Sequence, residues 1–127
     1  MNAIDTQVSF DDPELPARLD AMTDEQLHRL PFGVIGLDQE GKVRFYSDTE
    51  ARQSGAAPRT FGGMHFFETV APCMNNEEVR GRIEHALSEG NLDLEIGHTG
   101  DFSDPHRFLR IRAMSCQKGG LWLAHQR

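Results

Sequence analysis

The sequence has few cysteines, the residues that hold small secreted folds together through disulfides, and few tryptophans or tyrosines. Its 127 residues include two cysteines, one tryptophan and one tyrosine. Two thiols cannot build the disulfide framework of a small secreted domain. The short motifs of several enzyme and redox classes are also missing, namely HExxH, GxxxxGK[ST], GxSxG and CxxC. We therefore expect two reduced thiols in a cytoplasmic protein without the common motif-borne chemistries.

Long hydrophobic runs and an excess of positive charge are missing too. Mean hydropathy is −0.53, and no apolar run approaches the roughly 20 residues that span a bilayer. The N-terminal sequence lacks the basic and apolar regions of a signal peptide. Asp and Glu number 20 against 13 Lys and Arg, which gives a net charge of −7 at pH 7. This charge argues against nucleic acid and anionic membranes as partners.

What is present fits one α+β domain. Residues 1–28 are interpreted as an N-terminal cap, with a helical turn near 12–20 and a capping box from Thr23 to Gln26. Residues 29–127 form the core. Its expected elements are strands at 32–38 and 43–47, helices at 47–55, 65–70 and 77–89, and strands at 92–96, 109–113 and 121–124. Because the hairpin connections are short, this order predicts a five-stranded antiparallel sheet with helices on one face.

Four stretches make the interpretation more specific. They are LPFGVIGLD (30–38), GKVRFYSDTE (41–50), GMHFFETVAPC (63–73) and SEGNL (88–92). Together they resemble the photoactive yellow protein family, blue-light receptors with a PAS fold that carry p-coumaric acid as a thioester on a cysteine. The resemblance covers essentially the whole chain and runs without a gap from about residue 22 to residue 92.

The resemblance implies a role for each matching residue. Cys73 would carry the chromophore, Tyr46 and Glu50 would bind its ring oxygen, and Ser54 would support the tyrosine. The residues implied to line the pocket are Gly33, Ala56, Phe66 and Phe102. The chain also departs from the family pattern: Ala56 stands where an arginine is usual, and Gly100 and Asp104 replace larger apolar residues.

The implied chemistry follows from burying an ionised phenol. A buried anion needs hydrogen-bond donors, and Tyr46 and a neutral Glu50 would each donate one. Burial and the nearby anion would raise the pKa of Glu50 enough to keep it neutral. On illumination the ring would isomerise and Glu50 would pass its proton to it. The buried carboxylate left behind would favour partial unfolding of the N-terminal cap as the signal.

Plainer interpretations stay open for each of these residues. Cys73 alone is compatible with a buried structural thiol. Glu50 is the N3 residue of a Ser47 capping box, and on that interpretation it is exposed. Tyr46 is compatible with a strand aromatic whose hydroxyl reaches water, and Cys116 is expected to be uninvolved.

Further expectations concern the chain as a whole. The protein is not expected to be an enzyme, because on the interpretation that the resemblance implies, light drives a change within one molecule. No metal site is expected. The expected oligomeric state is a monomer or weak dimer, with an unidentified downstream signalling protein as partner. The alternative function is a PAS sensor or interaction module without a chromophore.

Overall fold

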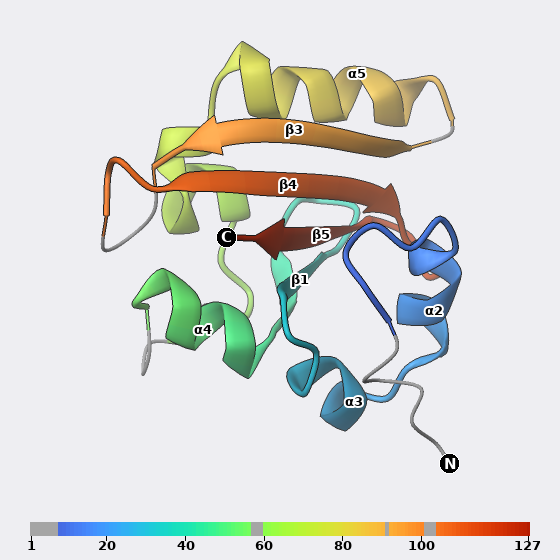
Figure 1. Ribbon diagram of the computed structural model, residues 1–127. Helices are drawn as coiled ribbons and strands as arrows, with labels where there is room; N and C mark the ends of the chain where they lie inside the picture. Colours follow the sequence, from blue (N-terminus) through green and yellow to red (C-terminus); the bar gives the residue numbers. More distant parts are fainter. Residues whose placement is uncertain (1–7, 57–59, 91, 101–103) are drawn as a thin grey trace.

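The computed structural model describes residues 8–56, 60–90, 92–100 and 104–127. Five strands form one antiparallel sheet in the order β2-β1-β5-β4-β3, which confirms the predicted sheet. β5 lies in the middle, between β1 and β4, so the first hairpin pairs with the last strand of the chain (Figure 1). The strands are β1 Gly33–Leu37, β2 Val43–Tyr46, β3 Asp93–Thr99, β4 Phe108–Ser115 and β5 Leu121–Gln126.

The helices are short and most begin at a side-chain cap. They are α2 Leu15–Ala21, α3 Asp24–His28, α4 Asp48–Ser54, η1 Phe66–Val70, η2 Pro72–Met74, η3 Glu77–Gly81 and α5 Arg82–Ser88. The predicted capping box of Thr23 and Gln26 is complete at the start of α3. Ser47 caps α4, and Gly55 ends it with φ 82°, a left-handed conformation that favours glycine.

Some expected boundaries are wrong. The helix expected at 77–89 is two elements, because η3 is a π-helical turn that precedes α5. Apolar periodicity indicates which face is buried but not whether a turn is widened, so this division could not be predicted. The strand expected at 92–96 extends further, because β3 pairs with β4 as far as Thr99. Strand pairing continues there through backbone hydrogen bonds that need no apolar alternation.

Both faces of the sheet are covered. Successive side chains of a strand point to opposite faces. Leu123 of β5 therefore joins one core cluster with residues of η1, η2, η3 and α5, whereas Trp122 and Ala124 join a second cluster with the N-terminal segment. The helices α2 and α3 lie together in Figure 1, apart from α5. The predicted cap is thus a separate layer on the face opposite the other helices.

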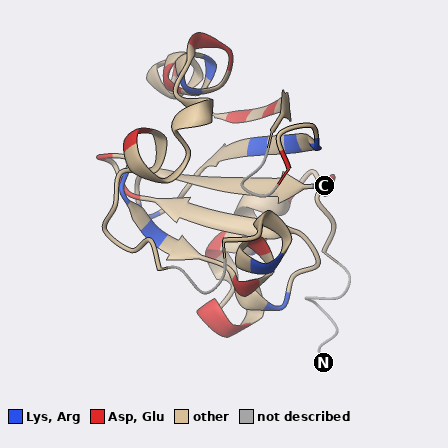
Figure 2. Cartoon of the chain, turned by 90° about the vertical axis from the view of Figure 1, so that its left-hand side faces the viewer, with Lys and Arg blue, Asp and Glu red and all other residues tan. Residues whose placement is uncertain are grey.

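Charged residues lie mainly outside the central strands. Basic β4 runs beside acidic β3, visible as adjoining blue and red bands (Figure 2). Two ion pairs join these strands, Arg110 with Glu95 and Arg112 with Asp93. Among the described residues, no helix combines the length and apolarity needed to cross a bilayer.

Candidate functional site

A cavity of about 230 Å³ lies between the middle of the sheet and the helical segments of one face. Its lining is mostly apolar, with a thiol and a small group of polar side chains. An apolar cavity of about 150 Å³ is enough to hold benzene. The space therefore suits an aromatic ring with a short chain. Its lining residues are Ile35, Tyr46, Glu50, Phe66, Val70, Ala71, Pro72, Cys73, Met74, Gly100, His125 and Arg127.

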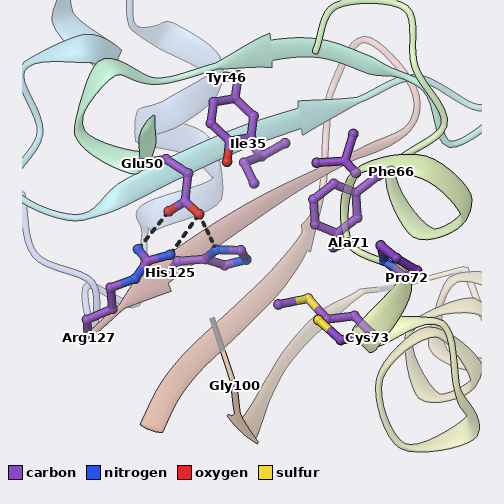
Figure 3. A pocket seen from close by; sticks show the side chains of 12 residues that line it. Ile35, Tyr46, Glu50, Phe66, Ala71, Pro72, Cys73, Gly100, His125 and Arg127 are labelled. Atoms are coloured by element: carbon purple, nitrogen blue, oxygen red, sulfur yellow. Dashed lines mark hydrogen bonds and ion pairs between the residues drawn. The ribbon is translucent and has the colours of Figure 1, made fainter. Parts of the chain in front are cut away.

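Glu50 forms the centre of the polar group. Its backbone N–H donates to the Ser47 hydroxyl, which places it in the first turn of α4. Its carboxylate accepts hydrogen bonds from Arg127 at 2.8 and 2.9 Å. His125 Nδ1 lies 3.0 Å from the same carboxylate (Figure 3). The carboxyl fits against β1 because Gly33 has no side chain: a Cβ there would overlap Oε1 of Glu50.

The surroundings of Glu50 favour its charged form. Burial alone would raise its pKa, but the charge of His125 and the hydrogen bonds from Arg127 and His125 outweigh this and lower the pKa to about 2. No positive charge in the pocket was predicted from the sequence. The neutral acid expected beside an ionised chromophore stays a prediction.

Glu50 is also not the exposed capping residue of the plainer interpretation. Its side chain is 3% exposed. Ser47 does cap α4 through its hydroxyl, but the Glu50 carboxyl turns toward Arg127 and His125. The same local pattern thus caps a helix and supplies a buried charge.

The thiol of Cys73 borders the same cavity from η2. The residue is exposed, so the alternative of a buried structural thiol is wrong. Pro72 fixes the start of this turn, and the Cys73 carbonyl accepts a hydrogen bond from the Asn76 side chain. Cys116 is buried instead, with Arg44 Nη2 2.8 Å from its sulfur. The two thiols therefore occupy unlike environments.

The remaining predicted residues divide between the cavity and its surroundings. Phe66 and Gly100 line the cavity, and Tyr46 packs its ring against Phe61 with centroids 4.8 Å apart. Ser54 and Ala56 are buried beyond the lining, where the Ala56 N–H donates to the Ser54 hydroxyl. Ala56 is therefore a core residue rather than a lining one. Phe102 lies outside the described residues.

Sequence reasoning missed His125 and Arg127, and Figure 3 shows the His125 ring between Glu50 and Cys73. A signal for His125 was present: on β5 it shares a face with buried Leu123, and a polar residue at such a position is unusual. Arg127 had no such signal. No group of three or more potential metal-ligating side chains occurs within the part of the chain that the structure describes.

Comparisons with known proteins agree with this architecture. A family model described as PAS fold matches residues 27–124. The photoactive yellow protein of Halochromatium salexigens is 36% identical over 95 residues, 75% of this chain and 76% of that protein. The photoactive yellow protein of Rhodothalassium salexigens is 30% identical over the same shares of the two chains.

A solved structure extends the agreement to three dimensions. The photoactive yellow protein domain of the sensor histidine kinase Ppr from Rhodospirillum centenum superposes with a TM-score of 0.79 at 29% identity, covering 88% of this chain and 99% of that domain. Sequence and fold thus agree on one classification. The chain belongs to the photoactive yellow protein family and is a PAS domain of the photoreceptor type.

Proposed function

We propose that this protein is a blue-light photoreceptor that carries p-coumaric acid as a thioester on Cys73. The observation that supports this most is that Cys73, Tyr46 and Glu50, which come from three different elements, all line the same cavity. These are the attachment and ring-binding residues that the family resemblance implies. The membership of the chain in a family named for photoactivity supports the same function.

The cavity suits this group in its chemistry as well as its size. The exposed thiol is accessible for acylation, the apolar lining around Phe66 suits a ring and double bond, and the polar residues suit a phenolic oxygen. When bound, the cinnamoyl group supplies blue-light absorption and isomerisation about its double bond. The protein supplies the attachment, the shielding from water and the hydrogen bonds.

The ring oxygen would be held by the Tyr46 hydroxyl, a donor at neutral pH. Glu50 and His125 lie within hydrogen-bond distance and act as one titrating pair. An ionised ring beside Glu50 favours proton uptake by this pair, because a second anion raises the cost of the carboxylate. We propose that this proton, held by the pair, is the one passed to the ring after isomerisation.

The signal would travel along β5 to the N-terminal cap. On β5, His125 faces the cavity, whereas Trp122 faces the cap and donates to Asp20 of α2 at 2.9 Å. Displacement of the strand therefore acts on both faces. Hydrogen exchange in darkness and under illumination tests this, and equal protection of residues 8–28 in both states would contradict it.

A signalling protein would then read the exposed surface. The related domain from Rhodospirillum centenum belongs to a sensor histidine kinase. This relationship supports a protein partner in a signalling pathway.

Reconstitution tests the proposed function directly. The purified chain is mixed with an activated p-coumaric acid, and intact mass and absorption are recorded. We expect an added p-coumaroyl mass and a blue-absorbing band that bleaches in light. Both should be lost in Cys73→Ser and retained in the matched Cys116→Ser variant. An unmodified, colourless protein would contradict the proposal and favour a PAS interaction module without a chromophore.

A further inference from the structure

We propose that His125 is the general base that activates the Cys73 thiol, with Glu50 as its positioning residue, so that the chain acylates itself from an activated hydroxycinnamoyl thioester. The nature of the acyl group rests on the proposed function. The activation of the thiol rests on the geometry of the site alone. The reaction is a single self-modification, without turnover.

The orientation of His125 carries the inference. Its side chain is 2% exposed, and its Nδ1 lies 3.0 Å from Oε2 of Glu50. A carboxylate only accepts hydrogen bonds, so Nδ1 carries a proton toward Glu50, and whenever the ring is deprotonated its lone pair lies on Nε2. Nε2 is buried and has no hydrogen-bond partner among the described residues. A buried basic nitrogen in this condition indicates a group that acts on a ligand or a neighbouring side chain.

The cavity brings this nitrogen and the thiol into one space. His125 and Cys73 both line it, and Figure 3 shows the imidazole between the Glu50 carboxylate and Cys73. A nucleophile, a base and a carboxylate that orients the base form the arrangement that activates thiols and hydroxyls in acyl transfer. Arg127 holds the carboxylate ionised from its other side.

The acyl transfer balances without any further reagent. His125 Nε2 accepts the Cys73 proton, and the thiolate attacks the carbonyl carbon of the thioester donor. The new carbon–sulfur bond forms as the donor's carbon–sulfur bond breaks. The imidazolium then returns its proton to the departing thiolate. One thioester replaces another, and His125 and Glu50 end as they began.

The charged and titratable groups facing His125 are known from the cavity lining. They are Glu50 of α4, Tyr46 of β2, Cys73 of η2 and Arg127 after β5. Glu50 contacts the imidazole directly, with its Oε2 3.0 Å from Nδ1. The pH profile of thiol reactivity therefore reports mainly on the Glu50–His125 pair.

The test is the rate of Cys73 modification in the protein before any chromophore is attached. Two probes are used, the thiophenyl ester of p-coumaric acid and iodoacetamide, with the site identified by peptide mass mapping. His125→Asn keeps a donor for Glu50 but removes the base. We expect its rate at pH 7 to fall on the order of a hundredfold. His106→Asn, which changes an exposed histidine in a loop, should keep the wild-type rate.

The pH profile separates a base from a merely structural residue. In the wild type the rate should level off well below the ordinary thiol range, because a base within the site takes the thiol proton. In His125→Asn it should climb about tenfold per pH unit toward the ordinary thiol range near 8.5. Glu50→Gln should shift the wild-type profile. Circular dichroism checks that each variant is folded. If a variant fails to fold, the pH profile of the wild type still tests the proposal.

The outcomes separate this proposal from the proposed function. Equal rates in wild type and folded His125→Asn, or a wild-type profile that rises only near 8.5, would overturn the role of His125 even if a photoactive adduct forms. Rapid, His125-dependent alkylation by iodoacetamide without p-coumaroyl transfer would support thiol activation and contradict the chromophore.

Discussion

Each face of the sheet carries an arginine–carboxylate pair with a buried arginine, but the carboxylate is buried only on the cavity face. On the cap face, Arg112 binds Asp93 at 2.8 Å and also donates to the backbone carbonyls of Phe10 and Asp12. On the cavity face, Arg127 binds Glu50 with both terminal nitrogens. One pair fastens a segment of chain to the sheet, and the other holds a charge beside an open cavity.

The difference lies in what surrounds each pair. Arg112 donates its hydrogen bonds to Asp93 and to two backbone carbonyls. None of these acceptors faces the cavity, so a ligand in the cavity does not contact this pair. Around Glu50 the third partner is His125, whose second nitrogen has no protein partner within the described residues. Binding of a ligand or a proton in the cavity therefore alters the hydrogen bonds of the Arg127–Glu50 pair before those of the Arg112–Asp93 pair. The Glu50 pair is thus the one that can respond to a ligand or a proton, whereas the Arg112 pair attaches the N-terminal cap to the sheet.

The largest effect is expected from removing Arg127. Arg127→Met removes both hydrogen bonds from the guanidinium and leaves the buried Glu50 carboxylate beside His125. Breaking a buried ion pair typically costs 3–5 kcal/mol, so we expect the free energy of unfolding in urea to fall by about 4 kcal/mol. Arg29→Met, which breaks an exposed i,i+4 pair with Glu25, should change it by less than about 0.5 kcal/mol. Equal effects of the two variants would contradict the buried pair.

The charge of Glu50 predicts how the free energy of unfolding depends on pH. Its pKa falls from 4.5 to about 2 on folding, so the pair stabilises the fold above the unfolded value and loses this contribution as pH falls toward 2. The loss amounts to about 3 kcal/mol. Glu50→Gln does not titrate, so its free energy of unfolding should fall less over this range than that of the wild type. Parallel pH curves for the two proteins would show that Glu50 does not hold this charge.

A smaller loss is expected on the cap face. Arg112→Met removes the bonds to Asp93 and to two cap carbonyls, but Asp93 is 43% exposed and water replaces part of what is lost. We expect the free energy of unfolding to fall by about 2 kcal/mol, with faster hydrogen exchange in residues 8–28. Arg110→Met, at a more exposed guanidinium, should have a lesser effect on both. Unchanged exchange in the Arg112 variant would show that this arginine does not fasten the cap.

The sequence predicted most of the architecture but only half of the polar site. Capping signals at Thr23 and Ser47 lie within a few residues of the helices they start, so local patterns found them. The partners of Glu50 lie 75 and 77 residues away along the chain. Only the pairing of β1 with β5 brings them together. No local pattern carries that distance, which is why His125 and Arg127 were not predicted as partners of Glu50.

Gly33 offers the mildest way to separate the two faces. A methyl group at this position would overlap Oε1 of Glu50, so Gly33→Ala must displace the carboxyl from Arg127 and His125. We expect unfolding to become easier by about 1–2 kcal/mol, typical of overpacking, and Cys73 alkylation to slow severalfold. Exchange in the cap should stay close to wild type, because Arg112 and its acceptors are untouched. Gly62→Ala, where a methyl group meets no atom within 4 Å, is the matched control. If hydrogen exchange in the cap rises as much as Cys73 alkylation slows, the two faces of the sheet are one cooperative unit even without light.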